Sequence, residues 1–114
     1  GEGFSLFGTP LFKPLVNGSA TFTIGANPTN GFALPISLGI QSSTLPSSTR
    51  YDFNPPSLSC NGTSCTTSTL TVQTNDPINS AYSYPIVVSG SGGSINGTTT
   101  VTIGSKAKPI FREF

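Results

Sequence analysis

The chain of 114 residues has very little charge: five lysines and arginines, four aspartates and glutamates, and a formal net charge of +1. Charged residues make up 8% of the sequence, whereas they make up about a quarter of a typical soluble domain. The basic residues form no strong cluster, so the electrostatic footprint of a nucleic-acid-binding protein is missing. No apolar run is long enough to span a bilayer. Ser, Thr, Asn and Gly must therefore provide the solubility.

Histidine is absent, and with it the commonest general base and the commonest zinc ligand. The four carboxylates are Glu2, Asp52, Asp76 and Glu113. No pair of them has the spacing of a glycosidase dyad on one element. We therefore expect a protein that is not an enzyme and that needs no cofactor.

A calcium site needs several converging oxygens, and Asn75, Asp76 and Asn79 offer three oxygen-bearing side chains in one segment. Asp76 stands directly before Pro77, however, and this composition is equally typical of a turn. We expect the turn, and no resident metal.

Tryptophan, the usual stacking residue of carbohydrate-binding surfaces, is also absent. Tyr51 and Tyr82 are the remaining candidates for a glycan contact, and together they make a thin platform. Tyr84 shares the parity of Ile86 and Val88, so we expect it beside the core, with its hydroxyl holding a loop. Carbohydrate binding stays an alternative on these grounds.

What the chain does contain is a succession of short β-branched segments in which apolar and hydroxyl residues alternate, as in half-buried strands. The clearest of them are residues 19–24, 68–74, 84–88 and 98–103. Nothing between them has the period of an amphipathic helix. Their regular spacing, with turn signals between them, predicts one all-β domain, a two-sheet sandwich of about seven antiparallel strands.

The expected strands begin with an edge of residues 3–7 that continues in residues 11–16, followed by residues 19–26, 32–40, 50–53, 67–74, 82–89 and 98–103. Asn17-Gly18 is an expected turn. Residues 41–50 are expected as an exposed loop, and residues 90–94 as a flexible hairpin tip. The phenylalanines expected in the core or at its seam are Phe4, Phe7, Phe12, Phe22, Phe32 and Phe53.

Two observations predict an extracellular or cell-surface location. Cys60 and Cys65 are the only cysteines, and a disulfide closing so short a loop would stabilise the fold by roughly 2 kcal/mol on the loop-entropy model. Sequons for glycosylation stand at Asn17, Asn61 and Asn96, although Asn-Gly is also a favoured turn dipeptide. No leader precedes Gly1, so we expect that an export signal was removed or left out.

Several stretches follow one another in the order of a loose family signature: residues 18–24, 28–32 with 35–38, 53–55, 68–72, and 84–90 with 99–102. On these stretches the chain resembles the immunoglobulin-like sandwich modules of secreted and cell-surface proteins of bacteria and archaea. The resemblance implies Greek-key connections and a role as spacer, stalk, adhesive tip or filament subunit. It also raises an internal Lys–Asn amide cross-link, for which Lys13 is the candidate. The cysteine loop and the segment after Gly104 depart from the pattern, so we expect any purpose peculiar to this protein there.

Residues 1–105 are the expected sandwich and residues 106–114 a tail, which carries three of the five basic residues and the apolar side chains Ile110, Phe111 and Phe114. An apolar segment of this kind can add itself as a strand to an open edge of a neighbouring copy. Repeated head to tail, this contact produces a fibre. A linker, the first strand of a further domain, or a segment folded back on its own sheet would explain the tail equally well.

The sequence thus predicts a non-catalytic extracellular structural module, either a spacer or a filament subunit. Its expected partners are copies of itself or neighbouring domains, with no nucleic acid and no membrane insertion. The alternative is a carbohydrate-binding or adhesive accessory module of a larger secreted protein.

Overall fold

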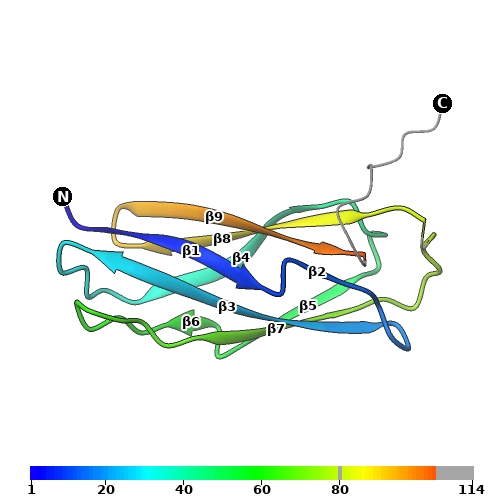
Figure 1. Ribbon diagram of the computed structural model, residues 1–114, viewed down its shortest axis with the longest axis horizontal. Coiled ribbons are helices and arrows are strands. Elements are labelled where there is room, and N and C mark those ends of the chain that lie inside the picture. Colours follow the sequence, from blue (N-terminus) through cyan, green and yellow to red (C-terminus); the bar gives the residue numbers. More distant parts are fainter. Residues whose placement is uncertain (80, 105–114) are drawn as a thin grey trace.

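The computed structural model describes residues 1–79 and 81–104, which form strands and no helix (Figure 1). Nine strands within these residues build two sheets that pack face to face. They are β1 (Gly3–Thr9), β2 (Phe12–Lys13), β3 (Ser19–Thr29), β4 (Ile36–Ser43), β5 (Arg50–Asn54), β6 (Ser57–Leu58), β7 (Ser68–Gln73), β8 (Tyr84–Gly92) and β9 (Ile95–Ile103). The all-β sandwich is confirmed. The described residues include no helix that could cross a membrane.

The first sheet has the order β1-β3-β7-β5, and all its neighbouring strands are antiparallel. The long strand β3 pairs with its two neighbours along different parts of its length. Residues 19–24 pair with β7, and residues 23–29 pair with β1. Along β3 and β7 the side chains alternate with period two. Apolar residues point into the sandwich and threonines point out: Phe22, Ile24, Leu70 and Val72 are buried, whereas Thr21, Thr23 and Thr69 are exposed.

The second sheet has the order β2-β9-β8-β4-β6. β9 pairs with β8 along its whole length, from Tyr84 opposite Ile103 to Gly92 opposite Ile95. β4 is antiparallel to β8, with a register irregularity between Ile40 and Ser42. β2 is the exception in this sheet, because it runs parallel to β9 and covers only its last two residues.

Two clusters of buried side chains fill the space between the sheets. The larger cluster contains Ala20, Phe22, Ile24, Leu45, Leu70, Val72, Ile86, Val88, Val101 and Ile103. The smaller cluster contains Ala26, Phe32, Ile36 and Leu58, and the side chains packed against it include Phe4, Leu6 and the two cysteines. Phe22 and Phe32 are fully buried, and burying a side chain of this size stabilises a fold by roughly 2–3 kcal/mol.

The hairpin at residues 17–18 confirms the expected turn. Asn17 and Gly18 have φ angles of 54° and 77°, a conformation that asparagine and glycine adopt most readily. Val16 and Ser19 exchange backbone hydrogen bonds of 2.9 and 3.1 Å across it.

Four expectations about the strands were wrong. The strands number nine rather than about seven, because β2 is separate from β1 and the two-residue β6 carries no sequence signature of its own. The strand expected at residues 32–40 begins only at Ile36, and it continues to Ser43 into the expected loop. Within the remaining loop Leu45 is buried. Strand β8 includes most of the expected hairpin tip, since it runs to Gly92.

Glycines explain why residues 90–92 belong to a strand. A Cβ atom on Gly90 would lie 2.8 Å from Ile36 Cγ2 and 3.0 Å from Leu6 Cδ1. On Gly92 it would lie 2.7 Å from the ring of Phe32. The missing side chains therefore make room for apolar groups of the smaller cluster, a role that glycine often has inside strands.

Candidate functional site

The two long sides of the sandwich differ in the edges that they present. One side, called here the β1/β9 flank, consists of β1 (Gly3–Thr9) and residues 95–101 of β9. β1 and β9 belong to different sheets and pack against each other. Neither stretch contains a charged residue or a proline. The opposite side, the β5/β6 flank, consists of β5 (Arg50–Asn54) and β6 (Ser57–Leu58).

The β9 edge of the β1/β9 flank has backbone groups that face outward. The N–H of Thr102 donates to the carbonyl of Leu11, and the N–H of Gly104 donates to that of Lys13, both at 2.9 Å. Because backbone groups alternate in direction along a strand, the N–H and C=O of Asn96, Thr98 and Thr100 point to the same side. Among the described strands none pairs with this side of residues 95–101.

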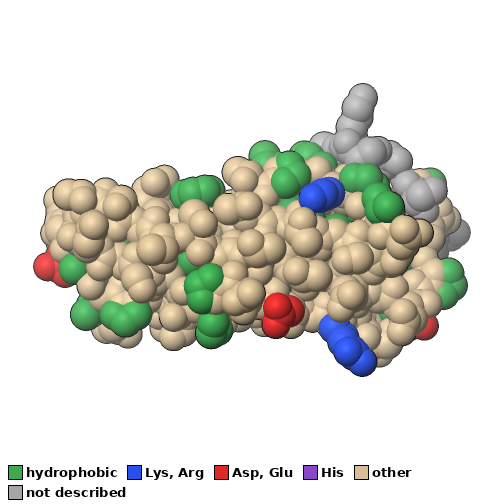
Figure 2. All heavy atoms as spheres, turned by 90° about the horizontal axis from the view of Figure 1, so that it is seen from below, with side chains coloured by type: hydrophobic (Ala, Val, Ile, Leu, Met, Phe, Trp, Pro, Cys, Tyr) green, Lys and Arg blue, Asp and Glu red, His purple; other side chains and the backbone are tan. Residues whose placement is uncertain are grey.

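The β5/β6 flank is protected in the ways that natural sheets use. Its longer strand has five residues and carries the exposed Arg50 and Asp52. Its shorter strand, β6, has two residues, and Pro55 and Pro56 lie between β5 and β6. Charged side chains are few on the face drawn in Figure 2, where polar side chains and backbone make up most of the surface.

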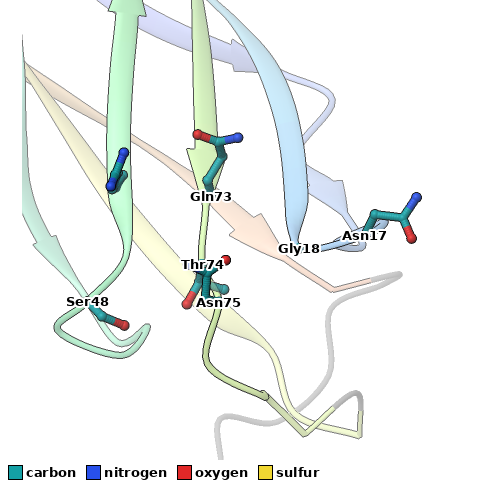
Figure 3. A pocket seen from close by; sticks show the side chains of 7 residues that line it. Asn17, Gly18, Ser48, Gln73, Thr74 and Asn75 are labelled. Atoms are coloured by element: carbon teal, nitrogen blue, oxygen red, sulfur yellow. The ribbon is translucent and has the colours of Figure 1, made fainter.

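A polar pocket lies at the end of the first sheet, where β3 and β5 begin and β7 ends (Figure 3). Its volume is about 220 Å³, and it is lined by Asn17, Gly18, Ser48, Arg50, Gln73, Thr74 and Asn75. Arg50 is the charged member of this set. Two of the lining residues are bonded to each other, since the N–H of Thr74 donates to the carbonyl of Gly18 at 2.9 Å. The amides, hydroxyls and guanidinium can donate and accept hydrogen bonds for a small polar ligand.

The disulfide between Cys60 and Cys65 is present, as the sequence predicts. Both cysteines pack against the smaller core cluster, and Gly62 lies beside the turn at Gly31. Inside the loop the carboxamide oxygen of Asn61 accepts hydrogen bonds from the backbone N–H groups of Thr63 and Ser64, both at 3.0 Å. The loop therefore covers one end of the core.

The three sequon asparagines lie at separate exposed positions. Asn17 is in the turn before β3 and lines the polar pocket. Asn61 is in the cysteine loop. Asn96 is near the start of β9, on the β1/β9 flank. All three side chains are accessible, and their glycosylation stays a prediction.

The tyrosines proposed for glycan contact have other neighbours in the structure. Tyr51 is half-buried against the larger cluster, and its hydroxyl donates to Ser43 Oγ at 2.6 Å. Tyr82 is half-buried and its ring lies 6.4 Å from that of Tyr84, centroid to centroid. The hydroxyl of Tyr84 accepts a hydrogen bond of 3.1 Å from the N–H of Asn79, so the expected link to a loop is confirmed.

The loop considered for calcium uses two of its oxygens within the protein. The carboxylate of Asp76 accepts a hydrogen bond from the hydroxyl of Ser48, and the carboxamide oxygen of Asn79 accepts one of 2.9 Å from the N–H of Ala81. Within residues 1–79 and 81–104, no group of three or more acidic, histidine or cysteine side chains is arranged to hold a metal ion.

The ammonium group of Lys13, the candidate for an amide cross-link, is hydrogen-bonded to a threonine. Its ammonium group donates to the carbonyl of Thr21 at 3.0 Å and to the hydroxyl of the same residue at 3.2 Å. These bonds join β2 of one sheet to β3 of the other.

Two features of the site could not be found by sequence reasoning. The pocket combines three strand ends that are far apart in the chain, and the open β9 edge depends on where β2 stops. The assembly residues Ile110, Phe111 and Phe114 lie outside the described residues. No protein-family model matches the chain, and no curated protein matches it. The geometry is therefore the basis for a functional assignment.

Proposed function

We propose that this chain is a non-catalytic, extracellular structural module that joins its neighbours by strand addition. The β1/β9 flank carries the proposal. Long, uncharged and proline-free edges are a risk that native sheets usually remove, and the β5/β6 flank of this molecule is protected against it. An edge that keeps these properties is suited to an incoming strand, whose main chain would satisfy the outward N–H and C=O groups.

The proposed topology is that of an immunoglobulin-like sandwich. In such domains one sheet contains the first, second, fifth and fourth strands, and the other contains the third, sixth and seventh. The order β1-β3-β7-β5 and the neighbouring strands β4, β8 and β9 support this topology. The short strands β2 and β6 would then be additions at the two edges of the second sheet.

An extracellular location is supported by the disulfide, the scarcity of charge and the exposure of the three sequons. Disulfides persist mainly in oxidising compartments. Thiol titration of the native protein should find no free thiol, and the intact mass of material from its natural source should exceed that of the polypeptide. Two reactive thiols, or a bare polypeptide mass, would count against the disulfide or the glycans respectively.

The proposed donor is the segment of residues 106–114, with Ile110, Phe111 and Phe114 as its apolar side chains. Repetition of such a head-to-tail contact does not close, so it generates a fibre. Electron microscopy of the full chain at increasing concentration tests this, and linear oligomers are the expected result. A variant that ends at Ser105 should give the same circular dichroism spectrum and no oligomers. A full chain that stays monomeric at high concentration would refute the proposal.

The second candidate function is carbohydrate binding, and the polar pocket is the observation that favours it. Arg50, Gln73 and Asn75 bring a guanidinium and two carboxamides to one depression, and sugar hydroxyls are recognised by such groups. A glycan array with the full chain tests this candidate, with Arg50→Ala as the pocket variant. Signals that disappear in the variant would support it, and a blank array would remove it.

A further inference from the structure

Strand addition requires an acceptor edge and a direction, and the structure points to both. We propose that residues 95–101 of β9 receive residues 106–114 of a second copy, and that the added strand runs parallel to β9. Neighbouring copies are then related by a shift along the long axis of the sandwich. This inference rests on the proposed function and goes beyond it, since it names the partner surface and the geometry of the fibre.

The acceptor edge has the required length and chemistry. Seven residues of extended chain span about 23 Å, at about 3.3 Å per residue, and a segment of nine residues is long enough to cover them. The outward backbone groups belong to Asn96, Thr98 and Thr100, alternate residues of one strand. No charged side chain lies on this stretch to repel an incoming strand.

The position of β2 indicates that the added strand comes from a second copy. β2 pairs with Thr102 and Ile103, directly before the point where the chain leaves β9. A segment that turned back on its own β9 after Gly104 would meet β2 before it reached Val101. The carbonyls of Leu11 and Lys13 already accept the N–H groups of Thr102 and Gly104. Beside residues 95–101 of a neighbouring molecule β2 is absent, and the strand that packs against β9 there is β1 of the other sheet.

The direction follows from the course of β9 along the molecule. β9 lies along the longest axis, and the chain leaves it at the end opposite to residue 95 (Figure 1). If a second copy is moved along this axis in the same orientation, residue 95 is the part of its β9 edge that the tail of the first copy reaches first. The incoming strand then runs in the same direction as that β9, so the two are parallel. β2 is also parallel to β9, and the added strand would extend the edge that β2 begins. An antiparallel strand would require a reversed neighbour, whose own tail points back and closes a dimer.

Pro109 sets the register of the donor. Proline has no N–H, so its nitrogen must face away from β9. The N–H groups of Ile110, Arg112 and Phe114 then face β9, because directions alternate along a strand. In a parallel pair these residues stand opposite the inward-facing residues of β9, such as Gly97 and Val101. The same rule places the side chains of Ile110, Arg112 and Phe114 on the side of β9 that packs on β1, and that of Phe111 on the opposite side.

Proline substitutions in the full chain test the donor. Arg112→Pro removes an N–H that faces β9, whereas Glu113→Pro removes one that faces away. We expect Arg112→Pro to weaken association at least tenfold in sedimentation velocity, and Glu113→Pro to change it less than twofold. Equal effects of the two variants would overturn the register.

The acceptor is tested in the same way at Thr98. Thr98→Pro removes an outward N–H without touching the bonds to β8, so the monomer should keep its circular dichroism spectrum and associate at least tenfold more weakly. Thr98→Val keeps the N–H and should associate like the parent chain. Amide exchange gives a readout without substitution: in the assembled parent chain, Thr98 and Thr100 should exchange at least tenfold more slowly than in the monomer.

The outcomes separate this inference from the proposed function. The acceptor is wrong, although assembly stands, if two results are found together. The Thr98→Pro variant forms fibres as well as the parent chain does, and amide exchange at Thr98 of the parent chain is the same in the fibre as in the monomer. If the parent chain forms closed dimers, the parallel direction is wrong. If it does not associate at all, both the proposed function and this inference fail.

Discussion

The β1/β9 flank and the β5/β6 flank belong to the same sandwich, yet they handle their unpaired backbone groups in opposite ways. The β5/β6 flank is short, and Arg50, Asp52 and two prolines stand on or beside it. The β1/β9 flank is longer, and its strand residues 3–9 and 95–101 include no charge and no proline, although Glu2 and Pro10 stand directly beside β1. The difference indicates that edge protection is selective here rather than general.

The two flanks also differ in how they are held to the core. β1 is held by close packing of its side chains on two glycines. Leu6 packs over Gly90, where an added Cβ would lie 3.0 Å from the Leu6 side chain, and Phe4 packs over Gly97, where it would lie 3.2 Å from the Phe4 ring. The region after β6 is attached covalently, through the Cys60–Cys65 loop that packs on the smaller cluster. The following substitutions test these differences, from the largest expected effect to the smallest.

Gly90→Val should disturb the β1/β9 flank most. The new side chain would collide with Ile36 and Leu6, and overpacking of this kind costs about 1–3 kcal/mol. We expect the free energy of unfolding to fall by about 2–3 kcal/mol in urea denaturation. Gly39→Val is the matched control, because a Cβ there would lie 3.6 Å from Ser89 Oγ, an ordinary contact. If both variants lose the same free energy of unfolding, close packing of side chains on Gly90 does not hold β1 in place.

Cys60→Ser combined with Cys65→Ser should weaken the covalently held region. Opening the loop should lower the free energy of unfolding by about 2 kcal/mol on the chain-entropy model. Since the cysteines pack on the smaller cluster, amide exchange should accelerate more at Leu58 than at Val101 of the larger cluster. A uniform acceleration would mean that the loop does not act on one end of the core.

Lys13→Met should loosen the boundary of the open β9 edge. The substitution keeps much of the aliphatic stem but removes the bonds from the ammonium group to Thr21. Because these bonds are exposed, we expect a loss of only about 0.5–1 kcal/mol. The N–H groups of Thr102 and Gly104 should exchange faster, as β2 separates more often. Unchanged exchange at both residues would show that Lys13 does not hold β2 in place.

Arg50→Thr combined with Asp52→Thr should remove the protection of the β5/β6 flank. The net charge stays +1, since one charge of each sign is lost. We expect the stability to change by less than about 0.5 kcal/mol, as for most surface substitutions. Light scattering should nevertheless show more self-association than in the parent chain. If the variant self-associates no more than the parent chain, these charges do not protect the β5/β6 flank. The charges would then not explain any difference in association between the two flanks.

Much of the fold could be predicted from local patterns. Phe22, Ile24, Leu70 and Val72 alternate with threonines, and the structure buries them as that alternation requires. Asn17-Gly18 forms the expected hairpin turn. The link from the hydroxyl of Tyr84 to a loop was also predictable, because the parity of Tyr84 placed it beside the core.

Other features were hidden from the sequence because they depend on distant neighbours. Leu45 stands alone in a polar segment, and only the arrangement of the sheets brings it into the larger cluster. Gly90 and Gly92 read as a flexible tip, although Leu6 and Phe32 occupy the space that their missing side chains leave. The polar pocket is likewise assembled from strand ends that are not consecutive in the chain.

The sequence by itself determined that this chain forms hydroxyl-covered strands, where several of its turns lie, and which two cysteines are joined. These properties arise between residues a few positions apart, so local chemistry specifies them. Only the tertiary structure decided which edges stay open, because that depends on where β2 stops beside β9 and on which strands meet across the two sheets. Such pairings join residues far apart in the chain, and their backbone hydrogen bonds are nearly independent of the side chains that a sequence displays.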